Sequence, residues 1–246
     1  MTRVQPPSSF HSSQLIRSLA ELDLLKSTEP TSDFADGLGR WLHFTDAIAL
    51  SSVHESGLAK MAVQSPELRE ATGARLVTEF ERIRSFMANS ITKSCKGGNT
   101  AIKLPLPDLD GSYVPYRRFY EAHQRDMELS IEPLRVNLRA ALAKASPQLR
   151  KLAELDAVMD KFLRAREAQL LARVPMLLQK RFEDRYAVHK EALAASDQPD
   201  NPAAWMHPGG WLASFCQDLQ TLLLAEAELR LQPSAGLLDA FNQQKL

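Results

Sequence analysis

Four residues suited to proton transfer or metal binding lie close together in the chain: His43, Asp46, His54 and Glu55. Apolar residues recur around them at helical spacing, so we expect all four on one helix. The two histidines would share one side of this helix but lie about 16 Å apart along its axis. That distance is too long for one metal ion unless another helix supplies ligands. These four are our candidate catalytic residues, although a histidine hydrogen-bonded at a helix interface is the interpretation we favour. We predict no metal site and no cofactor.

Linear signatures of common enzyme classes are missing from the sequence. It contains no phosphate-binding loop, no glycine-rich dinucleotide motif and no serine-hydrolase elbow. Cys95 lies beside Lys93 and Lys96, which could lower the pKa of its thiol. No base or oxyanion site is evident nearby, so we favour an incidental exposed thiol.

A basic and aromatic cluster marks the start of another predicted helix. Its candidate binding residues are Tyr116, Arg117, Arg118 and Tyr120. Such a cluster can bind phosphate or stack on nucleic-acid bases. Alternatively, its aromatic rings pack inside the protein while its arginines pair with acids such as Glu121. We favour packing, because the chain has 30 basic and 30 acidic residues and no net charge to attract nucleic acid.

Two further segments are candidate contacts with a protein partner. One follows Pro175, and the other is the tryptophan-flanked stretch from 205 to 211. The candidate binding residues in them are Met176, Phe182, Tyr186, Trp205 and Trp211. Apolar stripes on long helices exceed what a small bundle can cover, and such surfaces mark partner sites. Within the first segment, basic and acidic residues alternate, and we interpret them as a solvated helix face. They are Lys180, Arg181, Glu183, Asp184 and Arg185.

The elements that must position these residues are predicted to be helices. No glycine occurs between Gly111 and Gly209, which disfavours strands joined by tight turns. We expect an all-α fold, an elongated helical bundle with a long antiparallel, coiled-coil-like hairpin, turned at Ser146-Pro147 and bent at Pro133 and Pro175. Pro233 is expected to end the last long helix. The expected segments, in one domain overall, are a flexible tail (1–11), an N-terminal helical bundle segment (12–94), a loop (95–115), the hairpin (116–195), a linker (196–210) and a C-terminal helix and tail (211–246).

Composition narrows the possible compartments and partners. The two cysteines, Cys95 and Cys216, form neither a disulfide framework nor a zinc ligand set, which suits a reducing compartment. The N-terminus has no apolar signal region, and no stretch approaches the ~20 apolar residues that span a bilayer. We therefore expect a cytoplasmic protein that binds a protein partner or itself, without nucleic acid and without membrane insertion.

Four stretches together resemble a known family. They read FADGLGRWLHFTDAIALS (34–51), YRRFYEAHQRDM (116–127), RVPMLLQKRF (173–182) and LLLAEAELRLQP (222–233). They are similar to the proteobacterial family catalogued as domain of unknown function 3348, from about residue 12 to 241. The family carries no assigned activity. The resemblance implies a gene neighbourhood with an inner-membrane proton channel and a peptidoglycan-binding protein, and hence an accessory to an envelope machine.

Three functions are compatible with the sequence. We favour a helical, non-enzymatic interaction protein. The first alternative is an enzyme of unrecognised type using the His43–Glu55 residues in a bundle pocket, and the second is a weak nucleic-acid binder using the Arg117–Arg118 cluster.

Overall fold

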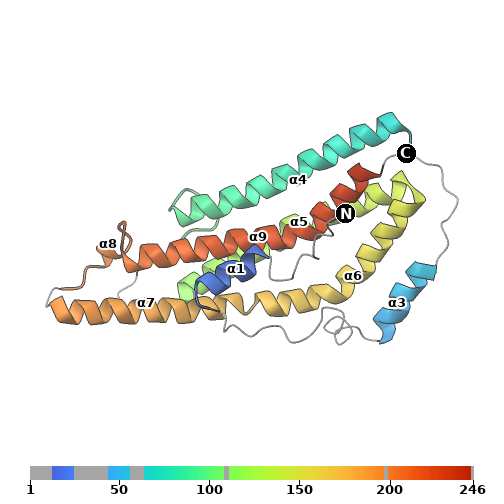
Figure 1. The fold of residues 1–246 in the computed structure, drawn as a ribbon. Helices are drawn as coiled ribbons and strands as arrows, with labels where there is room; N and C mark the ends of the chain where they lie inside the picture. Colours follow the sequence, from blue (N-terminus) through green and yellow to red (C-terminus); the bar gives the residue numbers. More distant parts are fainter. Residues whose placement is uncertain (1–12, 25–43, 56–63, 108–110, 197–198, 245–246) are drawn as a thin grey trace, which may run out of the picture. The chain divides into compact units, whose positions relative to one another are not determined.

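A computed structural model describes residues 13–24, 44–55, 64–107, 111–196 and 199–244. Within these ranges the chain is helical and contains no strand, which confirms the all-α prediction. The helices are α1 (Gln14–Glu21), α3 (Phe44–Glu55), α4 (Pro66–Cys95), α5 (Val114–Ala145), α6 (Pro147–Leu171), α7 (Val174–Ser196), α8 (Pro202–Trp205) and α9 (Trp211–Gln243) (Figure 1). No helix in the described ranges is both long enough and apolar enough to span a bilayer.

The chain divides into two compact units, and neither is a continuous stretch of sequence. Unit 1 comprises Met1–Ser27, Ala88–Gln124 and Pro175–Arg230. Unit 2 comprises Thr28–Met87, Arg125–Val174 and Leu231–Leu246. The helices α4, α5 and α9 each supply residues to both units.

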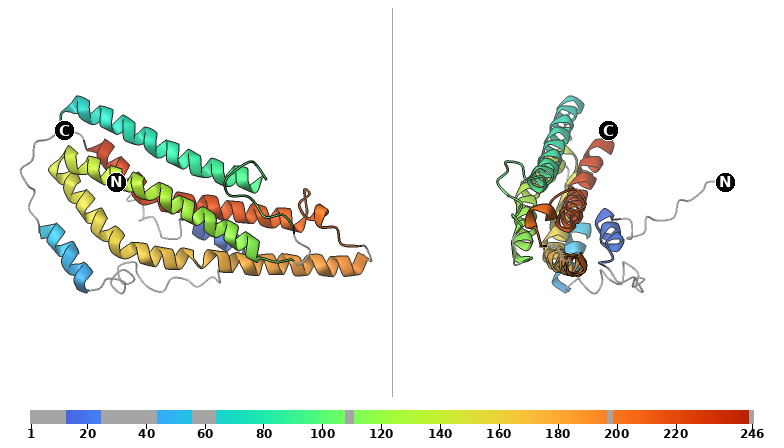
Figure 2. Two further views of the ribbon diagram at one scale, coloured as in Figure 1. Left: turned by 180° about the vertical axis from the view of Figure 1, so that it is seen from behind. Right: turned by 90° about the vertical axis from the view of Figure 1, so that its left-hand side faces the viewer.

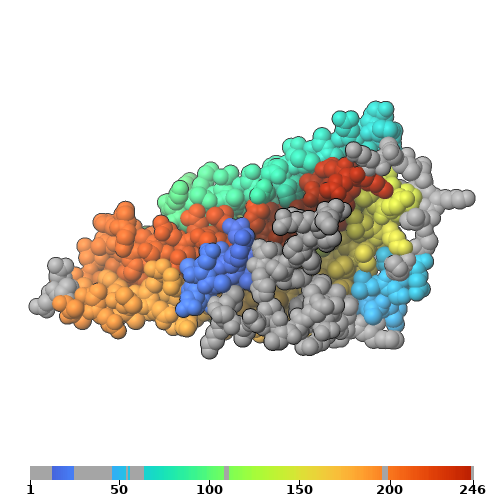
Figure 3. Space-filling view, in the orientation of Figure 1, coloured from blue at the N-terminus to red at the C-terminus, as the bar shows by residue number. Residues whose placement is uncertain are grey.

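The core of unit 1 is built from apolar residues at helical spacing. The first half of α5 buries Tyr116, Phe119 and Tyr120, and the first part of α9 buries Phe215 and Leu219. Residues three or four positions apart lie on one face of a helix, so each helix presents a continuous apolar stripe to the others. The short helix α1 adds Leu15 and Leu19 to the buried set and lies on the surface of this unit beside α7 and α9 (Figure 3).

Two helix ends follow directly from local sequence signals. Gly97 has a φ of +71°, the left-handed conformation that closes a helix C-terminus, and α4 ends just before it. Ser146 caps the start of α6 by accepting a hydrogen bond from the backbone N–H of Leu149 (3.2 Å), and Pro147 occupies the first helical position.

Unit 2 is crossed by a network of ion pairs between α5 and α6. Arg135 binds Asp156 (2.6 Å) and Asp160 (2.8 Å), and Arg139 binds the same two carboxylates. Burial alone would raise the pKa of Asp160, but hydrogen bonds from Arg139 and Arg164 outweigh it, so the pKa lies below its usual value. In the same unit α3 packs against α6 (Figure 2).

Two predicted helix boundaries are corrected by the structure. The single helix expected from 146 to 195 is interrupted at Ala172 and Arg173, so a continuous hairpin over 116–195 is not confirmed. The chain restarts as α7 with Pro175 in the first turn, where a missing N–H costs no intrahelical hydrogen bond. In contrast, α9 does not end at Pro233 but continues to Gln243. The ring of Pro233 faces solvent while Leu237 and Phe241 beyond it are buried, so packing holds the helix together past the proline.

Candidate functional site

The turn between α8 and α9 brings two tryptophans together. Gly209 has a φ of +87°, which favours glycine, and a Cβ on Gly210 would overlap the carbonyl oxygen of Trp205. This tight turn places the ring centroids of Trp205 and Trp211 5.3 Å apart. Both glycines are therefore needed for the tryptophans to meet.

These rings continue into a set that we call the aromatic cluster. It connects α7, α8, α9 and the start of α5. Phe182 is at its centre, with centroid distances of 5.2 Å to Trp211 and 5.1 Å to Phe215. Its members are Tyr113, Tyr116, Phe182, Tyr186, Trp205, Trp211 and Phe215. Edge-on and tilted ring pairs of this kind add stability beyond their buried area, so the cluster helps to hold these four helices together.

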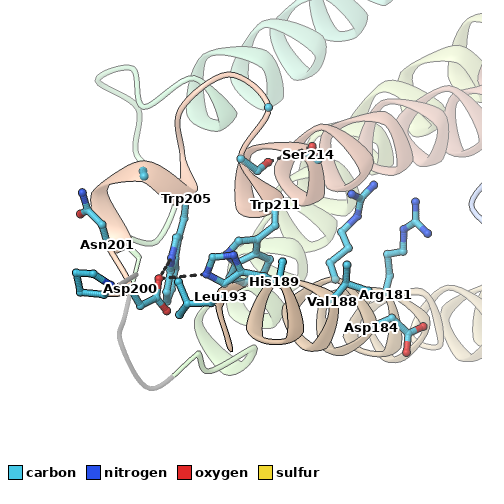
Figure 4. Close-up of a pocket in the computed structure, with 16 residues that line it drawn as sticks. Arg181, Asp184, Val188, His189, Leu193, Asp200, Asn201, Trp205, Trp211 and Ser214 are labelled. Carbon is cyan, nitrogen blue, oxygen red and sulfur yellow. Dashed lines mark hydrogen bonds and ion pairs between the residues drawn. The ribbon is translucent and has the colours of Figure 1, made fainter. Parts of the chain in front are cut away.

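A pocket of about 640 Å³ lies over the outer part of this cluster (Figure 4). One wall is a stripe of α7 that includes Arg181, Arg185 and Val188. The other is formed by residues 199–205, the glycine turn and the first turn of α9. All lining residues belong to unit 1. The volume is within the range of pockets that bind small ligands or a few side chains.

One end of the pocket is acidic. Asp200 accepts hydrogen bonds from Nε2 of His189 (3.1 Å) and from Nε1 of Trp205 (2.8 Å), as the dashed lines in Figure 4 show. Partial burial would raise the pKa of Asp200, but the two hydrogen bonds outweigh it and lower the pKa. Asp200 is therefore an ionised carboxylate at neutral pH, held in place by two side chains.

The other end is basic. Arg181 extends from α7 toward α9 (Figure 4), and both Arg181 and Arg185 bind Asp218 of α9, at 3.1 Å and 2.8 Å. The interpretation of these arginines as a solvated helix face is therefore wrong. Their partner lies more than thirty residues further along the chain, which no local charge pattern reveals.

Five of the residues selected from the sequence lie in or beside the aromatic cluster. Trp205 and Trp211 line the pocket. Tyr186 packs against Trp211, Phe182 packs against Tyr186, and Tyr116 packs against Phe182. The two sequence segments chosen independently, on α7 and around the glycine turn, are thus brought together.

The remaining binding candidates lie elsewhere in unit 1 or point outward. Arg117 is exposed and paired with Glu121 (2.7 Å), and Arg118 is exposed. Tyr120 is fully buried and donates its hydroxyl hydrogen bond to Glu226 (2.9 Å). Met176 is 63% exposed on α7. None of these four lines the pocket.

The candidate catalytic residues are only partly described. His43 and the side chain of His54 lie outside the described residues. Asp46 is in the first turn of α3, and Glu55, at its end, is exposed and accepts a hydrogen bond from Ser51 (2.9 Å). In the part of the chain that the structure describes, no group of three histidine, cysteine, aspartate or glutamate side chains could hold a metal ion.

A buried serine and histidine in unit 1 resemble a catalytic pair. Ser94 Oγ lies 2.9 Å from Nε2 of His123 and also 2.9 Å from the carbonyl oxygen of Ile91. Both side chains are almost fully buried, so no substrate reaches them.

Cys95 next to this pair is buried rather than exposed, contrary to expectation. Burial raises the pKa of its thiol to about 12, and the hydrogen bond with Ser94 only partly opposes this. The neighbouring lysines therefore do not activate it, and the thiol stays protonated at neutral pH.

Sequence reasoning missed three residues of the pocket region: His189, Asp200 and Asp218. Each is an ordinary surface residue type in a polar stretch, and Asp200 becomes distinctive only through its hydrogen bonds with His189 and Trp205. The Trp-x₅-Trp spacing with two glycines was the one signal that could have indicated this site.

Comparison with known proteins yields one family. The model of a family described as "protein of unknown function (DUF3348)" matches residues 1–243. No curated protein and no solved structure matches the chain.

Proposed function

Because the chain belongs to the DUF3348 family, whose description assigns no activity, we propose a function from its geometry: a helical interaction protein that binds a segment of a protein partner. The segment would bind in the pocket between α7 and the Trp205–Trp211 turn. The observation that carries this proposal is an open pocket whose walls combine tryptophan, arginine and exposed aliphatic side chains.

These residue types are those that dominate binding energy at protein interfaces. Tryptophan and arginine are the most enriched residues at interface hot spots, because they offer large contact areas and directional hydrogen bonds. Val188, 66% exposed at the rim, is a large apolar surface that a partner would cover.

Preorganisation of the walls also supports binding. Trp205 is almost completely buried, and its indole N–H and the imidazole of His189 are both fixed by Asp200. Phe182 packs against Trp211 and is itself packed against Phe215. A partner would then lose little binding energy to ordering these side chains.

We further propose that this interaction takes place in the cytoplasm, where the protein would serve as an accessory to an inner-membrane proton-channel or envelope machine. Support for this setting comes from the family resemblance and its gene neighbourhood, and from the absence of a spanning helix among the described residues.

Site-specific photo-crosslinking in cells that naturally make the protein tests the proposal. A photoreactive benzoylphenylalanine replaces Val188 at the pocket rim. The matched control replaces Lys180, which is exposed on α7 and does not line the pocket. We expect a reproducible crosslinked protein from position 188 and not from position 180.

Filling the pocket provides a second control. Ala192→Trp places a large side chain in the pocket, whereas Ala194→Trp places it on an exposed position of α7 outside the pocket. The crosslink from position 188 should disappear with the first variant and persist with the second. A product that survives Ala192→Trp, or the same product from position 180, would contradict the proposed function.

A further inference from the structure

At the basic end of the pocket two guanidiniums, those of Arg181 and Arg185, share one ion-pair partner, Asp218; the carboxylate of Asp184, which also lines the pocket, forms no ion pair with either of them. Nε of Arg181 (3.1 Å) and both Nε (3.2 Å) and a terminal nitrogen of Arg185 (2.8 Å) all donate to the same oxygen, Oδ2 of Asp218. Each guanidinium has five N–H donors, so most of them are not used in these bonds. Among the described residues, no other carboxylate lies within ion-pair distance of either arginine.

An apolar surface begins about one helical turn from Arg185 and two from Arg181. Val188 lies three residues after Arg185, about 4.5 Å further along the axis of α7. Ala192 and Leu193 continue this wall, and Trp211 faces it from α9 (Figure 4). An aliphatic or aromatic side chain placed there would remove Val188 from water.

The acidic end sets the direction in which a ligand can bind. The carboxylate of Asp200 lies beyond Trp205 and His189, at the opposite end of the lining from Arg181 (Figure 4). A second carboxylate would be repelled there and attracted at the arginines. A ligand with one acidic and one apolar group therefore has a single favourable orientation.

We propose that the pocket recognises a peptide segment in which an aspartate or glutamate lies one or two positions from a large apolar residue. The carboxylate binds Arg181 and Arg185, and the apolar side chain lies between Val188 and Trp211. The spacing follows from the geometry, since an extended peptide advances about 3.3 Å per residue and the two subsites are about 4.5 Å apart along α7. This inference rests on the proposed function and specifies the chemistry of the partner.

Selection of peptides on the full-length chain tests the ligand class. Random twelve-residue peptides displayed on phage are selected for binding to the wild-type protein. Phage that also bind the pocket-filling variant Ala192→Trp are discarded, because they bind outside the pocket. We expect enrichment of sequences with an acidic residue one or two positions from leucine, isoleucine, phenylalanine or tryptophan. Enrichment of basic peptides, of apolar peptides without acids, or of nothing above background would overturn the inference.

Charge variants then test the arginine subsite with a synthetic, fluorescein-labelled copy of the most enriched peptide. Asp218→Asn releases both guanidiniums and should tighten binding by roughly threefold to tenfold, the effect of one unit charge near a protein surface. Arg185→Gln leaves Arg181 to neutralise Asp218 and should weaken binding by about tenfold. Lys180→Gln removes a charge outside the pocket and should leave the affinity unchanged.

A gain in affinity is the decisive readout, because loss of structure cannot produce it. If Asp218→Asn does not fold, Arg181→Gln and the peptide with glutamine in place of its acidic residue test the same subsite. Equal affinity of the acidic and glutamine peptides would overturn the inference. So would displacement of the acidic peptide by inorganic phosphate or by single-stranded DNA at equal charge concentration, which would indicate a general anion site. If such results are obtained but the crosslink from position 188 is still seen, the proposed function is retained. Only the assignment of an acidic peptide as the ligand is then rejected.

Discussion

His123 should make the stability of the protein depend on pH between 7.5 and 5. Its side chain is 1% exposed, its Nε2 is hydrogen-bonded to Ser94, and burial lowers its pKa from 6.5 to about 4. The unfolded chain therefore binds a proton at a higher pH than the native chain does. The stabilisation from excluding this proton is fully present above pH 6.5 and is lost as the pH falls toward 4.

The size of the effect follows from the two pKa values. At pH 5 the unfolded histidine is almost fully protonated and the native one is mostly neutral. The difference in proton binding then reduces the free energy of unfolding by about 2 kcal/mol relative to pH 7.5.

Urea denaturation at pH 7.5 and at pH 5 measures this loss, with tryptophan fluorescence as the signal because Trp205 and Trp211 belong to the same unit as His123. The reference is His123→Gln, which retains a hydrogen-bond donor but does not titrate. Every other titrating group is common to both proteins and cancels in the comparison. The wild type should lose about 2 kcal/mol more than the variant on acidification. Equal losses in the two proteins would refute the assignment of a buried, neutral His123.

Four further substitutions should change stability in directions set by the structure. Gly111→Ala should lower the free energy of unfolding by about 2 kcal/mol or more, because φ is +60° and the new Cβ would lie 2.5 Å from the ring of Tyr186. Gly97 has a similar φ but no neighbour within 4 Å, so Gly97→Ala should lower the free energy of unfolding by only about 1 kcal/mol. Equal shifts of the thermal midpoint in Gly97→Ala and Gly111→Ala would contradict this account. Glu226→Leu should lower the free energy of unfolding in urea by about 3 kcal/mol, because it leaves the buried Tyr120 and the half-buried Arg230 without their acceptor. Glu121→Gln at the surface should have almost no effect. Pro233→Ala should stabilise the protein by about 1 kcal/mol or more, since it restores a backbone donor inside α9, and a lower thermal midpoint would show that the ring itself is needed.

Local signals in the sequence were sufficient for the fold class and for several helix ends. A serine followed by proline starts α4 and α6, and Gly97 ends α4. Each is a short-range preference that tertiary contacts do not need to create. The fate of Pro233 depends instead on packing: an exposed ring can be tolerated inside a helix whose opposite face is buried, and the sequence alone does not say which face that is.

The sequence predicted the aromatic residues of the candidate site but not their polar partners. The tryptophans and Phe182 stood out as large apolar residues in polar stretches. The polar partners did not, because Asp200 and Asp218 become distinctive only through pairing with His189 and the arginines of α7. Such pairs depend on how three helices and a turn meet, and charge periodicity along one helix contains no information about the next.

The interleaving of the two units limits how the protein can be dissected or recombined. The chain passes from one unit to the other five times, so no single contiguous gene fragment encodes either unit. Deleting Leu231–Leu246 removes part of one unit, and deleting Met1–Ser27 removes part of the other. Isolation of unit 1 as an independent protein would require three segments to be rejoined by new linkers. Gene fusion or exchange therefore preserves either unit only when the whole chain is transferred. The family match, which covers segments of both units, agrees with this.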